Sequence, residues 1–177
     1  MNDENVMSDC NSLKPKNIEI ERKYLIKMPD LGTLRMQPGY SSSSIEQMYI
    51  FDSGNSSRDR IRKRVFEDHV EYWKTHKENI NGISKIEIEN EITEEEYATL
   101  SECKIDNSRI IRKVRHCFVY KNQLLELDIY EFWTDCATVE AELESEDQEV
   151  ELPGFIEVIK DVTTDESYSN FALAMSK

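Results

Sequence analysis

The 177-residue sequence lacks the features that mark secreted, membrane-spanning or zinc-binding chains. Its four cysteines are scattered as single residues with no CxxC pair, a usage typical of a reducing compartment and without a zinc signature. No run is long and apolar enough to span a bilayer. The first residues carry neither the basic nor the apolar region of a signal peptide. We therefore expect a cytoplasmic protein that does not engage a membrane.

Positive charge is also scarce. Lys and Arg number 22 against 36 Asp and Glu, which gives a formal net charge of −14. Proteins that bind nucleic acid through a broad basic face show the opposite balance, so duplex nucleic acid is not an expected partner. Charged residues nevertheless make up 33% of the chain, above the roughly 25% of an average domain. The surplus predicts a heavily charged surface or an unusually polar interior.

Residues 1–17 are polar and aperiodic, which predicts a disordered leader before one domain over 18–177. From residue 18 onward, apolar and polar residues alternate with the period of two that is typical of strands. Eight strands are predicted, at 18–26, 45–52, 59–66, 70–77, 85–92, 110–120, 124–132 and 138–145. Helices are predicted at 28–36, 93–103 and 165–175, the second opening on a capping box at Thr93. The expected fold is mainly β, an eight-stranded antiparallel barrel closed to remove its edges, with a few flanking helices and a C-terminal helix.

Charged residues share strand faces, because side chains at i, i+2 and i+4 point to the same side of a strand. The ordinary interpretation is a sheet with its apolar face inward and its charged face in water. Solvated faces usually interleave signs, since like charges on one face repel. Here two rows carry a single sign, namely Arg60, Arg62 and Arg64, and Glu140, Glu142 and Glu144. Such rows favour a second interpretation, in which an anion and divalent cations lie among them.

A triphosphate with bound metal fits that second interpretation. Arginine and lysine contact phosphate oxygens directly, arginine in a bidentate manner. Mg²⁺ or Mn²⁺ prefers carboxylate and phosphate oxygens together. Carboxylates two residues apart on one strand have Cα atoms about 6–7 Å apart, close enough for glutamates to converge on one ion.

The ordered charge motifs resemble those of the CYTH proteins, or triphosphate tunnel metalloenzymes. Glu19-x-Glu21-x-Lys23 is similar to the ExExK signature at the start of the first strand. Further similar motifs follow in family order and extend the resemblance over about residues 18–173: Ile45-Glu-Gln47, Arg60-Ile-Arg62, Thr75-x-Lys77, Lys85-x-Glu87-x-Glu89, Lys113-Val-Arg115, Glu126-Leu-Asp128, Glu140-Ala-Glu142-Leu-Glu144, and Asp161-Val-Thr-x-Asp165 with Tyr168 and Asn170.

The resemblance implies that the charged faces line a tunnel, that the apolar faces point outward, and that Mg²⁺ or Mn²⁺ serves as cofactor, with two ions when substrate is bound. It implies a catalytic set of Glu19, Glu21, Lys23 and Glu142, with Glu87 and Glu89 as further tunnel acids. The implied metal ligands are Glu19, Glu21, Asp128, Glu140, Glu142 and Glu144. The implied phosphate-binding residues are Lys23, Arg60, Arg62, Lys77, Lys85, Lys113, Arg115 and Lys160.

Two features of the sequence depart from the family pattern. A one-residue shift of the 70–77 strand would place Lys74 and His76 in the tunnel in place of Lys77. Arg64 adds a third arginine to the row, at the tunnel mouth or in solvent. The apolar content of the C-terminal helix suggests that it plugs one tunnel end.

Several functions remain open at this point. The favoured one is metal-dependent hydrolysis of a short linear triphosphate, inorganic triphosphate first, with nucleoside or thiamine triphosphate as variants. An adenylate cyclase that makes cyclic AMP and pyrophosphate needs the same phosphate and metal contacts. An RNA 5′-triphosphatase and a non-catalytic polyphosphate or nucleotide binder are further alternatives. The expected partner is a small triphosphate, and the expected state is a monomer or a homodimer.

Overall fold

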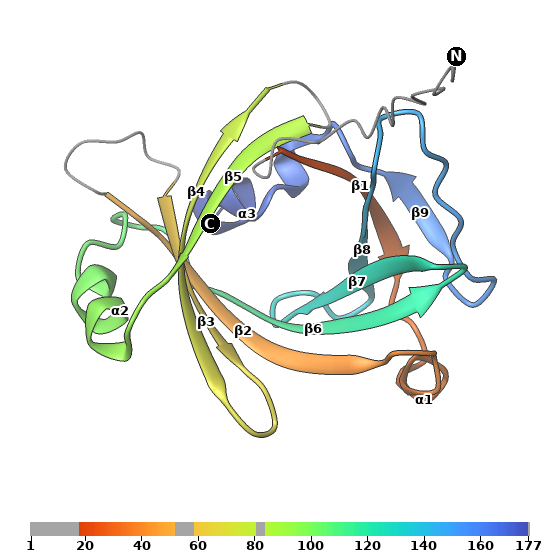
Figure 1. Cartoon of the computed structure of the whole chain (residues 1–177), viewed down its shortest axis with the longest axis horizontal. Coiled ribbons are helices and arrows are strands. Elements are labelled where there is room, and N and C mark those ends of the chain that lie inside the picture. Colours follow the sequence, from red (N-terminus) through yellow and green to blue (C-terminus); the bar gives the residue numbers. More distant parts are fainter. Residues whose placement is uncertain (1–17, 52–58, 81–83, 177) are drawn as a thin grey trace, which may run out of the picture.

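The computed structural model describes residues 18–51, 59–80 and 84–176, and the side chains of residues 77–79 and 85 fall outside that description. The leader predicted at 1–17 lies outside the described residues. Nine strands form one antiparallel sheet in the order β5-β4-β3-β2-β6-β7-β8-β1-β9, and a β1–β5 pairing closes the first eight into the predicted barrel. Figure 1 looks into the ring of strands.

The strands are β1 (Ile18–Lys27), β2 (Ser41–Ile50), β3 (Asp59–Val65), β4 (Val70–Asn79), β5 (Ser84–Glu91), β6 (Ile111–Tyr120), β7 (Gln123–Tyr130), β8 (Cys136–Glu142) and β9 (Val158–Asp161). The helices are α1 (Leu31–Arg35), α2 (Glu94–Ser101), the 3₁₀ turn η1 (Glu166–Tyr168) and α3 (Asn170–Met175). No helix in the described ranges is long and apolar enough to cross a bilayer.

β1 has two partners along one edge, and this closes the barrel. Its first residues pair with β5, with Ile18 opposite Ile86, while its later residues pair with β9, with Tyr24 opposite Asp161. Its other edge pairs with β8. β9 was not predicted, because four residues are too few to show alternation. β2 begins four residues earlier than predicted, since pairing with β6 extends it through serines that carry no apolar pattern.

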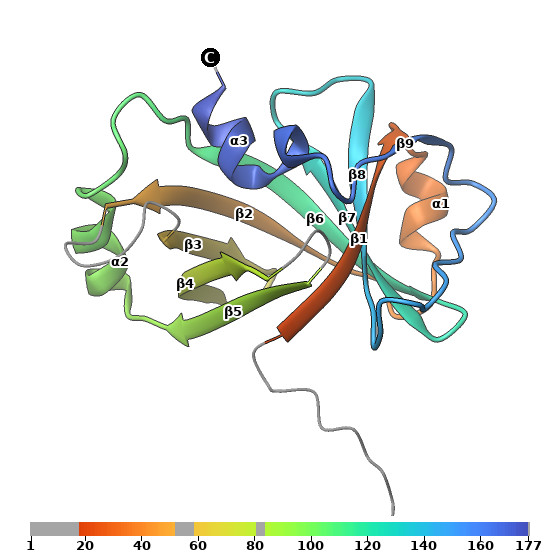
Figure 2. The ribbon, with the colours of Figure 1, turned by 90° about the horizontal axis from the view of Figure 1, so that it is seen from above.

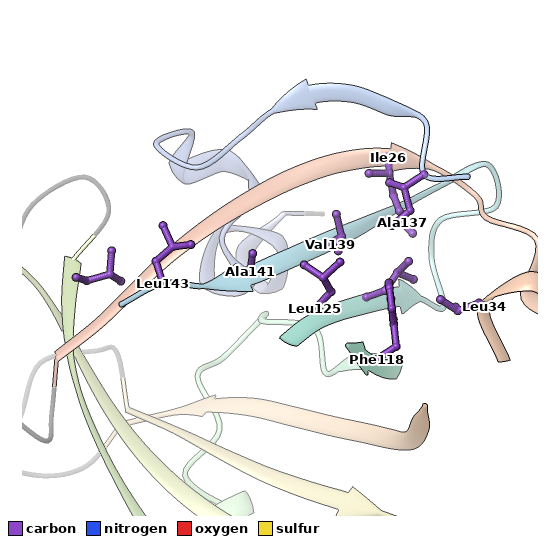
Figure 3. Close-up of a cluster of buried hydrophobic side chains, with 11 residues drawn as sticks. Ile26, Leu34, Phe118, Leu125, Ala137, Val139, Ala141 and Leu143 are labelled. Atoms are coloured by element: carbon purple, nitrogen blue, oxygen red, sulfur yellow. The ribbon is translucent and has the colours of Figure 1, made fainter. Parts of the chain in front are cut away.

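The apolar faces of the barrel point outward, as predicted. In Figure 3, Phe118, Leu125 and Val139 project from β6, β7 and β8 toward one cluster, with Leu34 of α1 at its edge. All four side chains are fully buried. On the other side of the barrel, Tyr97 of α2 covers the outward residues Met48, Ile50 and Ile61. Figure 2 shows α1 and α2 on opposite sides of the ring.

The predicted C-terminal helix is divided at Ser169, which ends η1 and caps α3 through its hydroxyl. Leu173 and Ala174 of α3 pack against the inward-facing Tyr49, Ile111 and Tyr130. Figures 1 and 2 show α3 lying across one end of the barrel. This apolar layer inside the barrel matches the plug that the sequence suggested.

The capping box of α2 provides a test of the local structure. Thr93 Oγ1 accepts a hydrogen bond from Glu96 N–H at 3.1 Å, and Glu96 Oε2 accepts one from Thr93 N–H at 2.7 Å. We expect Thr93→Ala to lower the free energy of unfolding by about 1 kcal/mol, as loss of a cap usually does. Urea unfolding followed by circular dichroism measures the change. Thr99→Ala, the same substitution inside α2, is the control, and an equal loss there would contradict a capping role.

Candidate active site

The barrel encloses a cavity of about 290 Å³. Its wall is built from alternate residues of the strands, because one side of each strand faces the centre of the barrel. Six of the eight strands contribute described charged residues to this wall. The charged residues on the wall are Glu19, Glu21, Lys23, Arg60, Arg62, Arg64, Glu87, Glu89, Lys113, Arg115, Glu126, Glu140 and Glu142.

One ion-pair network joins β3 to β5. Arg60 Nη2 lies 2.8 Å from Glu87 Oε1, and Arg62 Nη2 lies 2.8 Å from Glu89 Oε1. Thr75 of β4 donates its hydroxyl to the same Glu89 oxygen at 2.8 Å. Thr75 is fully buried on the inward face, which places Lys74 and His76 on the outward face. His76 Nδ1 there contacts Asp59 at 2.5 Å.

A second network joins β1, β6, β7 and β8. Arg115 holds Asp128 with two bonds, from Nε at 2.8 Å and from Nη2 at 2.7 Å, and it also contacts Glu126 and Glu140. Lys113 donates to Asp128 as well. Lys23 Nζ lies 2.9 Å from Glu140 Oε1. Asp128 lies on the same face of β7 as Glu126 and is fully buried, and its carboxylate orients the two cations, Lys113 and Arg115, that face the cavity.

Burial and neighbouring charges shift the pKa values of several groups on the cavity wall. Burial opposes ionisation of Glu140, but Lys23 and then Arg115 outweigh it and hold the pKa of Glu140 well below its ordinary value. Burial, opposed by Asp128 and reinforced by Arg115, lowers the pKa of Lys113 to about 8. Burial and the nearby Arg60 lower the pKa of Arg62 to about 10. Lys113 and Arg62 thus lie where an added anion would be favourable.

The arginines of β3 have donors to spare for such an anion. Arg60 Nε and Arg62 Nε are buried and form no hydrogen bond with the described residues. Buried polar groups are normally bonded, so orphaned donors in a cavity wall point to a missing ligand. Guanidinium donors match phosphate oxygens in geometry and charge. The wall therefore fits a phosphate chain.

Carboxylates meet across the β1–β8 pair, where Glu21 is directly opposite Glu142. Like charges in this position destabilise a sheet. The Glu142 carboxylate forms no ion pair with the part of the chain that is described, whereas Glu140 is bound by Lys23 and Arg115. Oxygen donors of this kind suit a hard divalent cation. An ion near Glu21 and Glu142 would relieve their repulsion.

The described carboxylates do not form a ready-made cage. No group of three or more His, Cys, Asp or Glu residues among them stands close enough together to hold a metal ion. Mg²⁺ usually keeps several waters and takes one or two carboxylates together with substrate phosphates, so it does not require such a cage. The donor set therefore fits an ion that arrives with its phosphate.

The segment before α3 closes one end of the cavity and is hydrogen-bonded to β1. Lys23 N–H donates to Thr163 Oγ1 at 3.1 Å, and Val162 N–H donates to Lys23 O at 2.9 Å. The hydroxyl of Tyr130 donates to Asn170 Oδ1 at 2.8 Å. These bonds position the C-terminal residues of the cavity wall, which are Val162, Thr163, Asp165, Glu166, Tyr168, Ser169, Asn170 and Phe171.

Most of the predicted site residues with described side chains line the cavity, but three lie elsewhere. Asp128 is fully buried and does not line the cavity, and both of its oxygens accept hydrogen bonds from Arg115. Glu144 is exposed in a bend beyond the end of β8. Lys160 is exposed on β9, where Nζ lies 2.6 Å from Asp165 Oδ2. Their functional roles stay predictions, and these positions do not favour direct contact with the substrate.

Two further predicted residues are located by backbone register alone. Lys77 pairs with Glu87, and Lys85 pairs with Glu19. The register therefore agrees with the prediction that assigned Lys77, and not Lys74 and His76, to the tunnel, because Lys77 lies two residues from the inward-facing Thr75.

The predicted site residues did not include Glu126, although Glu126 lines the cavity. Its position two residues before Asp128 was the available signal.

The fold and the cavity together define a closed eight-stranded antiparallel barrel with a charged interior, the architecture that the resemblance of the ordered motifs implied. No protein-family model matches the sequence, and no curated protein matches it. Among solved structures, the chain is similar to the inorganic triphosphatase NE1496, with 28% identity and a TM-score of 0.55 over 90% of this chain and 95% of that one. The chain is also similar to the PH1819 protein from Pyrococcus horikoshii, with 21% identity and a TM-score of 0.55 over 73% of this chain and 80% of that one. That similarity shows the fold alone.

Proposed function

We propose that this protein is a metal-dependent triphosphatase that hydrolyses a short linear triphosphate, with inorganic triphosphate as the preferred substrate. The observation that carries the proposal is one enclosed cavity whose wall holds both cations for phosphates and carboxylates for metal. The similarity to NE1496, a protein named as an inorganic triphosphatase, supports it. The reaction adds one water and yields orthophosphate and pyrophosphate.

In this proposal the basic residues bind and orient the phosphate chain. Arg60 and Arg62 contact it with their Nε donors from β3, while Lys23 contacts it from β1 and Lys113 and Arg115 contact it from β6. As the bond to the terminal phosphorus breaks, negative charge grows on the pyrophosphate, and fixed cations stabilise that charge without reorganising. Lys77 and Lys85 are proposed to add to this set.

The carboxylates of β1 and β8 are proposed to hold Mg²⁺ or Mn²⁺. Glu19, Glu21 and Glu142 are the proposed protein ligands. Glu140 is proposed as a further ligand, although Lys23 and Arg115 each bind one of its oxygens. When bound there, such an ion would polarise phosphoryl oxygens and would lower the pKa of a bound water. Glu87 and Glu89 hold Arg60 and Arg62 in place.

One panel tests the function and separates the alternatives. Inorganic triphosphate, ATP, thiamine triphosphate and 5′-triphosphorylated RNA are each incubated with the protein in Mg²⁺, in Mn²⁺ or in chelator, and the products are resolved. We expect orthophosphate from inorganic triphosphate with metal and none in chelator. Cyclic AMP with pyrophosphate would identify a cyclase. Tight binding of triphosphate without any product would identify a binding module and overturn the proposal.

Lys113 gives the proposal a pH signature. Its pKa of about 8 leaves it half-protonated near pH 8, and a bound anion raises that pKa, so binding draws a proton from solution. We expect the wild type to take up roughly half a proton more than Lys113→Met when triphosphate binds slightly above pH 8. Calorimetry in buffers of different ionisation enthalpy measures the difference. Equal uptake by the two proteins would contradict contact between Lys113 and the phosphates.

A further inference from the structure

We propose that Arg64 forms an additional phosphate subsite, which extends the substrate range of this cavity to inorganic chains longer than triphosphate. The inference rests on the proposed function, since it concerns the same cavity. Arg64 is the third arginine of the inward row on β3 and lines the cavity with Arg60 and Arg62.

The row is longer than a triphosphate requires. Strand geometry places the Cα atoms of Arg60 and Arg64 about 13 Å apart, whereas only two anhydride oxygens separate the terminal phosphorus atoms of a triphosphate. Arg60 pairs with Tyr49, whose ring contacts Phe171 of the plug, and Arg64 pairs with Ile45 four residues away. A phosphate chain bound at Arg60 and Arg62 is therefore blocked at the plug end and can lengthen toward Arg64.

Arg64 also differs from its neighbours in charge balance. Every other described cation on the cavity wall has a carboxylate partner, including Arg60 with Glu87 and Arg62 with Glu89. Arg64 has none among the described residues. Its bonds are instead a hydrogen bond from Nε to Ser43 Oγ at 2.9 Å and a contact of its guanidinium with the Phe66 ring at 4.5 Å. Its positive charge is therefore available to bind an anion.

Those two neutral contacts fix the side chain without using its other donors. Ser43 is 4% exposed, so the anchor of Nε is buried. The two Nη amino groups form no hydrogen bond within the described ranges and remain as donors. A guanidinium held in this way loses little side-chain entropy when it binds a phosphate. Arg64 is therefore prepared to bind one further phosphate.

The surroundings favour a phosphate over a nucleobase at this position. The Phe66 ring stacks on His69 with centroids 4.3 Å apart and planes 8° apart, while the Arg64 guanidinium covers the ring at 4.5 Å. Two groups this close cannot share one face, so both faces of Phe66 are covered. A base would find no open face there on which to stack. The ligand chemistry that fits is an inorganic polyphosphate of four or more phosphates.

The experiment compares chain lengths in matched variants. Binding of inorganic triphosphate, inorganic tetraphosphate and ATP is measured by calorimetry with Mg²⁺, and hydrolysis is followed as orthophosphate release. The proteins are wild type, Arg64→Ala, Arg64→Lys and Lys63→Ala, the last an outward residue of the same strand. We expect Arg64→Ala to weaken tetraphosphate binding and kcat/KM by about ten- to a hundredfold, the usual effect of losing one charge-assisted contact. Triphosphate should change by less than about threefold, Arg64→Lys should restore part of the loss, and Lys63→Ala should resemble the wild type.

The other outcomes are equally informative. Equal losses on both inorganic chains, or no loss on either, would overturn the subsite. A loss confined to ATP would indicate contact with the nucleoside and would also overturn it. If no substrate is hydrolysed but binding still depends on chain length through Arg64, the proposed catalytic function fails and the subsite stands.

Discussion

Glu140→Ala combined with Glu142→Ala is expected to lower the rate of orthophosphate release from inorganic triphosphate by about a thousandfold or more. Glu142 lies opposite Glu21 on the paired strand, and Glu140 binds Lys23 and Arg115. The double variant removes proposed metal ligands and leaves two buried cations without one of their partners. Phosphate release at saturating Mg²⁺ measures the effect.

A matched double substitution separates this effect from a general loss of charge. Asp147→Ala with Glu149→Ala also removes two acidic residues, but both are exposed in the loop after β8. We expect that variant to hydrolyse triphosphate at nearly the wild-type rate. Circular dichroism confirms that both variants are folded. Wild-type turnover by a folded Glu140→Ala/Glu142→Ala protein would refute a catalytic role for this strand.

Asp128→Asn is expected to have the largest effect on stability, a loss of about 3–5 kcal/mol in the free energy of unfolding. Asp128 is fully buried, and its carboxylate bonds to Arg115 and Lys113. The substitution keeps the shape but removes the negative charge, so two buried cations lose their main compensation. Urea unfolding, compared with Glu157→Gln, measures the loss. Glu157 forms an exposed ion pair with Lys27, which contributes at most about 1 kcal/mol.

The same variant decides between two roles for Asp128. A group that orients Arg115 and Lys113 affects stability in the absence of metal. A direct metal ligand affects Mg²⁺ affinity more than stability measured in chelator. Unchanged stability in chelator together with a large loss of Mg²⁺ affinity would return Asp128 to the ligand set that the sequence predicted.

The site residues predicted from alternation face the cavity where they lie within a strand, because the strand determines the direction of each side chain. Glu19, Glu21 and Lys23 face the cavity because they share one side of β1, and Arg60 and Arg62 do so from β3. Prediction from alternation weakens where the strand ends. Glu144 continues the acidic row of β8 in sequence, but the strand stops at Glu142 and the next residues turn away. A pattern with a period of two does not indicate where hydrogen bonding to a neighbour ceases.

The sequence by itself determined the strand content, the single-signed rows and their alternation with apolar residues, since a period of two follows from strand geometry alone. Only the tertiary structure decided which face is inside. The β1–β5 pairing closes the sheet, and α1, α2 and the loops cover its apolar outer face, so the charges turn inward. The ion pair of Glu140 with Lys23 joins residues of β8 and β1 that are far apart in the sequence, and the ion pair of Arg60 with Glu87 joins β3 to β5. Such contacts depend on the register of several strands at once, which no local pattern encodes.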